Sequence, residues 1–166
     1  FLWRTALHKG CAATFAEASG ATSLSATNNL NLKTVQTGER NNIKWNADNH
    51  LNYGNTQEVG SQISGGGSIK LSAGNDINAR AANVQAKDAL SVNATGSVNI
   101  VAGQNTSNLD EAHKTTGKGF MSKTTVTTRE TRNSSTAQAS NFGGGTVSID
   151  AGKDIRVLGS NVIGDG

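Results

Sequence analysis

The stretch Ser68-Ile-Lys-Leu-Ser-Ala-Gly-Asn-Asp-Ile-Asn-Ala79 determines the fold that we expect for this chain. Its apolar side chains alternate with polar ones on both sides of a Gly-Asn-Asp turn, which predicts two short strands that each bury one face. A third short strand is expected at Asn83-Val84-Gln85. A unit of this size cannot bury a core alone, so it must pack against other units of the same kind.

The same pattern recurs along the chain. Moving forward from Leu71 by 21 or 78 positions gives Val92 or Ile149, and the neighbouring apolar positions match as well. Moving backward by 26 and then by a further 21 positions gives Trp45 and Leu24. The sequence therefore predicts five copies of the unit, near residues 22–34, 43–55, 69–81, 90–102 and 147–159.

Stacking these copies gives an all-β fold, a parallel β-helix or solenoid of about five coils with 21 residues each. Neighbouring coils lie about 4.8 Å apart, and their apolar side chains form one continuous column. This arrangement explains how a chain with only 32 Val, Ile, Leu and Phe residues among 166 can fold. The absence of proline agrees with it, because proline would remove a ladder hydrogen bond.

Two spacings depart from 21 residues. We interpret the spacing of 26 as one coil plus a five-residue loop near Gly65-Gly66-Gly67. The spacing of 57 is either one coil plus about 36 inserted residues, or two irregular coils plus 15. The resulting domain organisation is an N-terminal segment, coils, an inserted arm and a final coil, at residues 1–19, 20–103, 104–145 and 146–166.

The N-terminal segment does not follow the repeat. Thr5 to Ala18 could form a short helix that caps the solenoid, and residues 1–19 could equally be a non-native leader.

The inserted arm, residues 104–145, is rich in threonine and has almost no apolar face. It has the character of a hairpin whose chain returns at Gly143-Gly144-Gly145. It is either an interaction arm or a solvated strand pair that extends the sheet. Phe120 is the expected buried anchor of this segment. The candidate interaction residues are Lys114, Lys118, Phe120, Lys123, Arg129 and Arg132.

The polar residues of the repeat are expected to have structural roles. Asp76 and Asp154 occupy the same turn position, so we interpret them as turn formers rather than as a catalytic acid and base. The asparagines at the turns are expected to stack as ladders: Asn28, Asn29, Asn49 and Asn75.

Catalytic, metal and cofactor sites are not predicted. The three histidines are isolated in the sequence, and His50 falls at the turn position that Asp76 occupies in another copy. A net charge of +3 from dispersed residues does not indicate nucleic-acid binding. The alternative to a non-enzymatic protein is a β-helical carbohydrate-active enzyme, a lyase or a glycosidase. That enzyme would need a groove lined with charged residues and a loop bearing carboxylates.

Three segments of the chain carry a family resemblance. Residues 69–77 and 147–155 both read apolar-x-apolar-x-Ala-Gly-x-Asp-Ile, and Gly159-Ser-Asn-Val162 follows the second of them. Together with the Thr-rich insertion from Lys114 to Thr131, these segments resemble the filamentous haemagglutinin repeat of large two-partner secreted proteins. Those proteins include adhesins and contact-dependent growth inhibition effectors.

The resemblance covers residues 20–166 and implies a right-handed parallel β-helix. It implies a structural or adhesive segment that presents an adhesive or toxin module at the surface of a Gram-negative cell and aids its delivery to a target cell. The implied partners are an outer-membrane transporter and a receptor, protein or glycan, on a target or host cell. The exposed sheets at the coil ends predict self-association of the fragment.

Overall fold

The computed structural model describes residues 3–6 and 15–165. All regular structure in these residues is β-strand. They divide into two units, which we describe separately. The coil stack comprises the described residues of 1–35, 58–103 and 137–165, and the hairpin sheet comprises residues 36–57 and 104–136.

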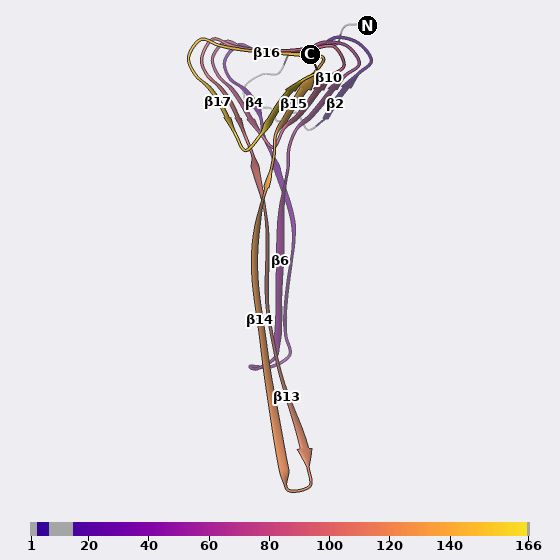
Figure 1. The fold of residues 1–166 in the computed structure, drawn as a ribbon, viewed down its shortest axis with the longest axis vertical. Helices are drawn as coiled ribbons and strands as arrows, with labels where there is room; N and C mark the ends of the chain where they lie inside the picture. The colour runs from indigo at the N-terminus through magenta and orange to yellow at the C-terminus, as the bar shows by residue number, and fades with distance from the viewer. Residues whose placement is uncertain (1–2, 7–14, 166) are drawn as a thin grey trace. The chain divides into compact units, whose positions relative to one another are not determined.

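The coil stack consists of three parallel sheets, each formed by equivalent strands of successive coils (Figure 1). The first sheet has the order β1 (Trp3–Ala6), β3 (Thr22–Ala26), β8 (Ile69–Ala73), β11 (Ala89–Ala94), β16 (Thr146–Ala151). The second has the order β4 (Leu30–Leu32), β9 (Ile77–Arg80), β12 (Val98–Val101), β17 (Ile155–Leu158). The third has the order β2 (Phe15–Ala18), β7 (Gln62–Gly65), β10 (Asn83–Ala86), β15 (Asn141–Gly144), β18 (Asn161–Gly164).

Four coils therefore lie in register, and we number them in chain order. Coil 1 contains β3, β4 and β7; coil 2 contains β8, β9 and β10; coil 3 contains β11, β12 and β15; coil 4 contains β16, β17 and β18. The first sheet aligns Leu24 with Leu71, Leu71 with Val92, and Val92 with Ile149. Leu71 and Val92 are completely buried. The predicted parallel β-helix and its apolar column are confirmed for these four copies.

The predicted copy at residues 43–55 is wrong. This segment lies in the hairpin sheet, where Trp45 is 56% exposed between β5 (Val35–Lys44) and β6 (His50–Val59). Coil 1 instead takes its third strand from β7, so residues 36–57 are an insertion within the coil. The expected loop at Gly65-Gly66-Gly67 is also wrong, because these glycines end β7 and form the ordinary turn into β8.

Both insertions interrupt the same corner of the coil. In coils 2 and 4 this corner is a tight turn with a residue in the left-handed region, Ala81 at φ 47° and Gly159 at φ 60°. In coil 1 the chain leaves after Lys33 and returns at Ser61, whose hydroxyl donates to the Lys33 carbonyl oxygen at 3.2 Å. Coil 3 has the same arrangement at its own corner.

In coil 3 the chain leaves after Val101 and returns at Ser140. The Ser140 hydroxyl donates to the Val101 carbonyl oxygen at 2.8 Å and accepts from the backbone N–H of Ala82 at 3.0 Å. Ser61 and Ser140 are fully buried. Each serine therefore bridges the two ends of an interrupted corner, and Ser140 also pairs the N–H of the buried Ala82.

Asparagine side chains of successive coils bond to one another in ladders, as predicted. Asn75 Nδ2 donates to Asn29 Oδ1 at 2.8 Å, so these two residues form a turn ladder. Asn49 was assigned wrongly, because it lies in the hairpin sheet with its amide on Asn46 Oδ1. A ladder that we did not predict runs along the second sheet, with amide contacts of 3.1 and 3.0 Å through Asn31, Asn78 and Asn99.

The N-terminal segment is not helical where it is described. Residues 3–6 and 15–18 are strands that pair in parallel with β3 and β7. The expected helix over Thr5 to Ala18 is therefore wrong at both of its ends, and residues 7–14 lie outside the described residues. Because β1 and β2 pair with strands of coil 1, they extend the first and the third sheet by one strand each.

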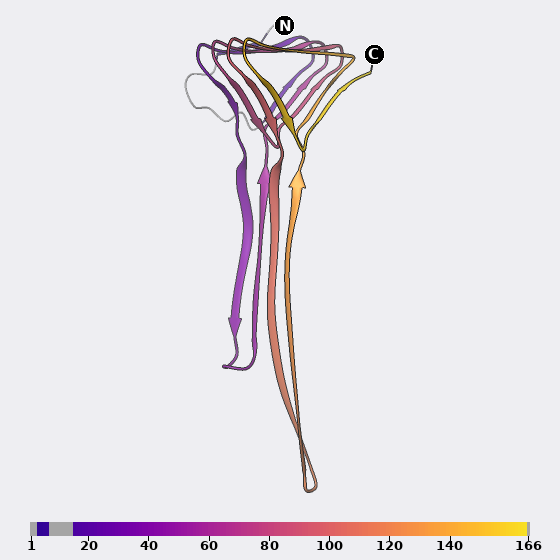
Figure 2. The same cartoon turned by 60° about the vertical axis from the view of Figure 1, so that its left-hand side comes forward.

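The hairpin sheet has four strands in the order β14 (Ser122–Gln138), β13 (Gly103–Gly119), β6, β5, which lie side by side in Figure 2. β13 and β6 are antiparallel, with Leu109 opposite Tyr53. The prediction that Phe120 is a buried anchor is wrong, because its side chain is 98% exposed at the turn between β13 and β14. The buried aromatic residue of the predicted arm is Phe142, which is 1% exposed on β15 of the coil stack.

Candidate functional site

The six candidate interaction residues all lie in the hairpin sheet. Lys114 and Lys118 are on β13, Phe120 is in the turn, and the other three are on β14. Three of the six are paired with carboxylates. Lys114 pairs with Asp48 at 2.9 Å, Arg129 with Asp110 at 3.2 Å, and Arg132 with Glu130 at 3.2 Å. The Arg129 pair joins β14 to β13, and the Lys114 pair joins β13 to the turn between β5 and β6. The Arg132 pair lies within β14.

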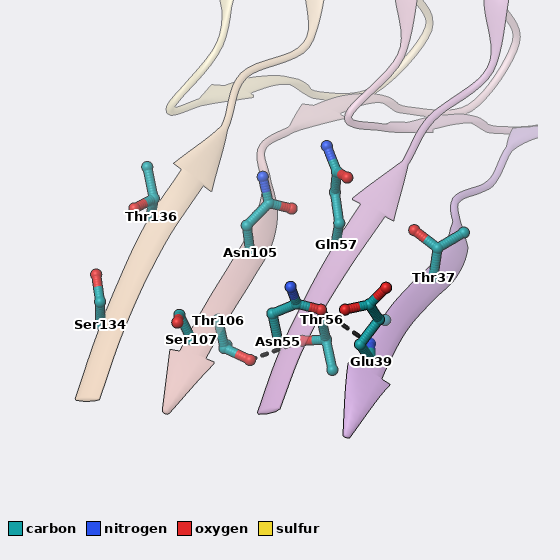
Figure 3. A pocket seen from close by; sticks show the side chains of 11 residues that line it. Thr37, Glu39, Asn55, Thr56, Gln57, Asn105, Thr106, Ser107, Ser134 and Thr136 are labelled. Carbon is teal, nitrogen blue, oxygen red and sulfur yellow. Dashed lines mark hydrogen bonds between the residues drawn. The ribbon is translucent and has the colours of Figure 1, made fainter. Parts of the chain in front are cut away.

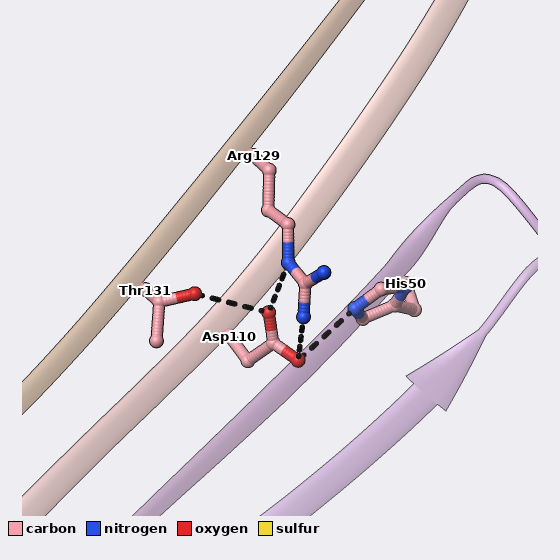
Figure 4. Close-up of polar contacts among 4 residues, drawn as sticks. All are labelled: His50, Asp110, Arg129 and Thr131. Carbon is pink, nitrogen blue, oxygen red and sulfur yellow. Dashed lines mark hydrogen bonds and ion pairs between the residues drawn. The ribbon is translucent and has the colours of Figure 1, made fainter.

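Asp110 is the centre of a cross-strand cluster (Figure 4). Arg129 donates from Nε to Oδ1 at 3.2 Å and from Nη2 to Oδ2 at 3.4 Å, while His50 Nε2 lies 3.3 Å from Oδ2. Thr131 Oγ1 donates to Oδ1 at 3.4 Å. The hydrogen bond from Arg129 lowers the pKa of Asp110 below its ordinary value, although partial desolvation opposes that effect. The cluster joins β6, β13 and β14 through one carboxylate.

His50 therefore has a role that its sequence position did not indicate. We expected it at a coil turn, but it lies on β6 and contacts Asp110 across the antiparallel pair. His113 contacts Glu111 on its own strand, and its ring stacks on Trp45 with the ring centroids 6.1 Å apart. Within the described residues, no group of three or more His, Cys, Asp or Glu side chains could hold a metal ion.

A polar groove of about 590 Å³ lies on the hairpin sheet (Figure 3). Its lining comes from four neighbouring strands: Thr37, Gly38 and Glu39 on β5, Asn55, Thr56 and Gln57 on β6, Asn105, Thr106 and Ser107 on β13, and Ser134 and Thr136 on β14. The side chains offer amide and hydroxyl groups, which both donate and accept hydrogen bonds. The groove can therefore hold a hydroxyl-rich ligand by hydrogen bonds.

Two contacts shape this groove. Asn55 Oδ1 accepts from the backbone N–H of Glu39 at 2.8 Å, and the hydroxyls of Thr56 and Thr106 lie 2.6 Å apart. Gly38 is required for the close approach of β5 and β6, because a Cβ there would lie 2.2 Å from the Asn55 carbonyl oxygen. The sequence did not predict this groove, since its residues are brought together only by the pairing of the two hairpins.

The geometry does not assemble an acid–base pair from Asp76 and Asp154. Asp76 Oδ1 accepts from the backbone N–H of Ser97 at 2.8 Å, so Asp76 lies at a coil turn, as expected, and bonds to the turn of the next coil. Asp154 lies in coil 4 and Asp76 in coil 2, with the Ser97 turn of coil 3 between them. Glu39 is the only carboxylate among the groove residues. The paired carboxylates that glycoside hydrolysis requires are therefore not formed by these residues.

No helix in the described part of the chain is long and apolar enough to span a membrane. The comparisons with known proteins concern the coil stack and the hairpin sheet together. The family model described as hemagglutinin repeat matches residues 48–166. No solved structure matches the chain.

Three curated relatives are similar to the chain. A 16S rRNA endonuclease CdiA of Enterobacter cloacae is 31% identical over 110 residues, which cover 66% of the chain and 3% of the relative. A deoxyribonuclease CdiA of Dickeya dadantii is 29% identical over 117 residues, 70% of the chain and 4% of the relative. A tRNA nuclease CdiA-2 of Burkholderia pseudomallei is 30% identical over 149 residues, 87% of the chain and 4% of the relative. The chain thus spans only a small part of each relative.

Proposed function

Because this chain belongs to the hemagglutinin repeat family, we propose that it is a rigid spacer within a long exoprotein, with the hairpin sheet as its contact surface for a target cell. Proteins of this family are secreted or displayed on the surface of Gram-negative bacteria. The spacer would hold an adhesive or toxin module away from the producing cell and aid its delivery. Its partners would be an outer-membrane transporter and a receptor on the target cell.

The observation that carries the spacer role is the unbroken register of four coils. Each coil bonds to the next along all three sheets, and the apolar column continues through them. One coil advances the stack by about 4.8 Å. Repeat proteins of this kind gain their stability from contacts between neighbouring repeats, so the stack can be long without a large core.

The names of the relatives support a role that is separate from catalysis. They name three different nucleases, which act on 16S rRNA, DNA and tRNA. A segment that all three share cannot be the source of three different specificities. A common spacer or contact segment explains why it occurs in each of them.

One test uses a substitution that disrupts the column in the parent exoprotein. Leu71→Asp places a carboxylate at a completely buried position, while Lys70→Asp changes the adjacent exposed position. We expect Leu71→Asp to lower the number of bound target cells at least about tenfold at equal surface amounts of exoprotein, with Lys70→Asp like wild type. Unchanged binding by Leu71→Asp, with the coils shown by limited proteolysis to be unfolded, would contradict the spacer role.

The polar groove supports a second proposal, that the receptor contact is with a glycan. Its amide and hydroxyl lining matches the hydrogen-bonding groups of a sugar. The test is binding of the chain to an array of surface glycans, with Gln57→Ala in the groove and Thr124→Ala on β14 outside it. Gln57→Ala should weaken binding and Thr124→Ala should not. Equal effects of the two substitutions, or no glycan bound, would refute the groove as a receptor site.

A further inference from the structure

The turn of the longer hairpin carries two large apolar side chains in full contact with solvent. Phe120 is 98% exposed and Met121 is 94% exposed. The other large hydrophobic side chains that are exposed in the described residues reach at most 56%. Isolated apolar residues on a surface are ordinary, but two adjacent ones at this exposure indicate an interaction site.

The backbone holds both side chains away from the rest of the hairpin sheet. They form a two-residue turn between Gly119 and Ser122. Met121 has φ 56°, in the left-handed region that glycine and asparagine adopt with less strain. A methionine at this position is therefore better explained by what its side chain contacts than by the requirements of the turn.

The turn also lies beyond the part of the hairpin that other strands support. The last residue of β13 paired with β6 is Ala112, opposite His50, and β13 continues to Gly119. The seven further residues, 113 to 119, span about 23 Å at the usual strand rise. No atom outside its neighbours lies within 4 Å of the Cβ position of Gly117. The residues from 113 to 123 are all exposed, so the tip of the hairpin is accessible to a partner.

The charge around the tip has one sign. Between Lys114 and Arg129 there are four cations and no Asp or Glu. The outer two, Lys114 and Arg129, are paired with Asp48 and Asp110. Among the described residues, Lys118 and Lys123 make no ion pair, and each lies two positions from the apolar turn. The positive charge that is left uncompensated therefore flanks Phe120 and Met121.

We propose that Phe120 and Met121 insert into a lipid surface that carries anionic headgroups, while Lys118 and Lys123 bind its phosphates. Apolar side chains of interfacial proteins enter the boundary between headgroups and acyl chains, and nearby lysines add attraction to anionic lipid. The adjoining strands are threonine-rich, with Val126 the nearest other large apolar residue. A stable protein interface needs a larger desolvated patch than two residues supply, whereas insertion into lipid does not. This inference is independent of the spacer role and of the polar groove.

The test is sedimentation of the chain with vesicles of phosphatidylcholine alone or with one third phosphatidylglycerol. Phe120→Ser with Met121→Asn removes the apolar pair and keeps a residue that tolerates positive φ. Val126→Thr is the matched control, because it removes an apolar group from the same hairpin away from the turn. We expect binding to the anionic vesicles, a loss of at least about tenfold in the double variant, and no loss in the control.

A second variant pair tests the lysines. Lys118→Gln with Lys123→Gln should weaken binding about tenfold at low salt and by less at high salt, because salt screens exposed charges. The proposal is overturned if no vesicle is bound, if the apolar double variant binds as well as wild type, or if Val126→Thr weakens binding equally. If the wild-type chain binds no vesicles but the apolar double variant loses binding to target cells, the tip contacts a protein receptor, and this result would also overturn the proposal.

Discussion

The substitution Leu71→Ala tests the apolar column at its middle. Leu71 is completely buried, and its backbone partners in the neighbouring coils are Leu24 and Val92. Removing a buried leucine side chain costs about 2–5 kcal/mol, since it removes apolar contacts and leaves a cavity. At about 2–4 °C per kcal/mol for a chain of this size, the midpoint of thermal unfolding should fall by roughly 5–20 °C.

Trp45→Ala is the informative comparison. The repeat pattern places Trp45 at the same position of the coil as Leu71, but the structure places it in the hairpin sheet, 56% exposed. Its stacking on His113 is worth about 1 kcal/mol, so its removal should have a small effect. The assay is thermal and denaturant unfolding followed by far-ultraviolet circular dichroism. An effect of Trp45→Ala equal to that of Leu71→Ala, or a Leu71→Ala variant as stable as wild type, would refute the reasoning.

Four further outcomes are expected. In denaturant unfolding, Phe142→Ala should lower the free energy of unfolding by about 3–5 kcal/mol and Phe120→Ser by less than about 0.5 kcal/mol. The reverse order would contradict the placement of Phe142 in the core and of Phe120 at the exposed turn. Ser140→Ala should cost about 1–3 kcal/mol, because it leaves the N–H of the buried Ala82 unpaired and removes one of the two donors to the Val101 carbonyl oxygen, whereas the exposed Ser134→Ala should cost little. In an NMR titration, the pKa of Asp110 should lie below the ordinary value of an aspartate and should rise in Arg129→Gln. Because its folded-state pKa is lowered, the cluster stabilises the fold at pH values above the ordinary aspartate pKa, and this contribution is lost as the pH falls through the folded-state pKa. An unchanged pKa in the variant would disprove the assigned cause. The exposed apolar side chains of coil 4, including Ile155 and Ile163, predict association that increases with concentration in light scattering, and a monodisperse monomer over a wide concentration range would contradict it.

The coil stack was largely predictable because its signal is local and repeated. Ile69, Leu71 and Ala73 alternate inward, and the same alternation returns in register 21 residues later. The copy at Trp45 was wrong for a physical reason: short apolar alternation is common to a coil strand and to a hairpin strand, so periodicity alone cannot separate them.

Phe142 could have been identified from the sequence. The third strand of the coil begins with a polar amide residue followed by a buried apolar one, at Gln62-Ile63, Asn83-Val84 and Asn141-Phe142. Asn141-Phe142 follows this pattern, although the predicted inserted arm, residues 104–145, includes it. Phe120, in contrast, lies between Gly119 and Met121 in a polar, threonine-rich segment and has no counterpart in the coils.

The polar groove and the Asp110 cluster were not predictable in the same way. Both depend on the pairing of β6 with β13, which joins residues about 50 positions apart, such as Thr56 and Thr106. The strands of the hairpin sheet are polar on both faces, and register is weakly specified by sequence when no face is buried. Only the coordinates of the paired strands reveal which of their side chains become neighbours.

The most direct test of the account is a disulfide between coils 1 and 2. Ser23 and Lys70 are paired in register on adjacent parallel strands, so their Cα atoms lie within the range that a disulfide can bridge. In a background with Cys11→Ser, the account predicts that Ser23→Cys with Lys70→Cys forms an intramolecular disulfide under mild oxidation. Lys44→Cys with Lys70→Cys, the pair expected if residues 43–55 were a coil, should remain reduced. Cross-linking of the second pair but not the first would contradict the stacking of coil 1 on coil 2.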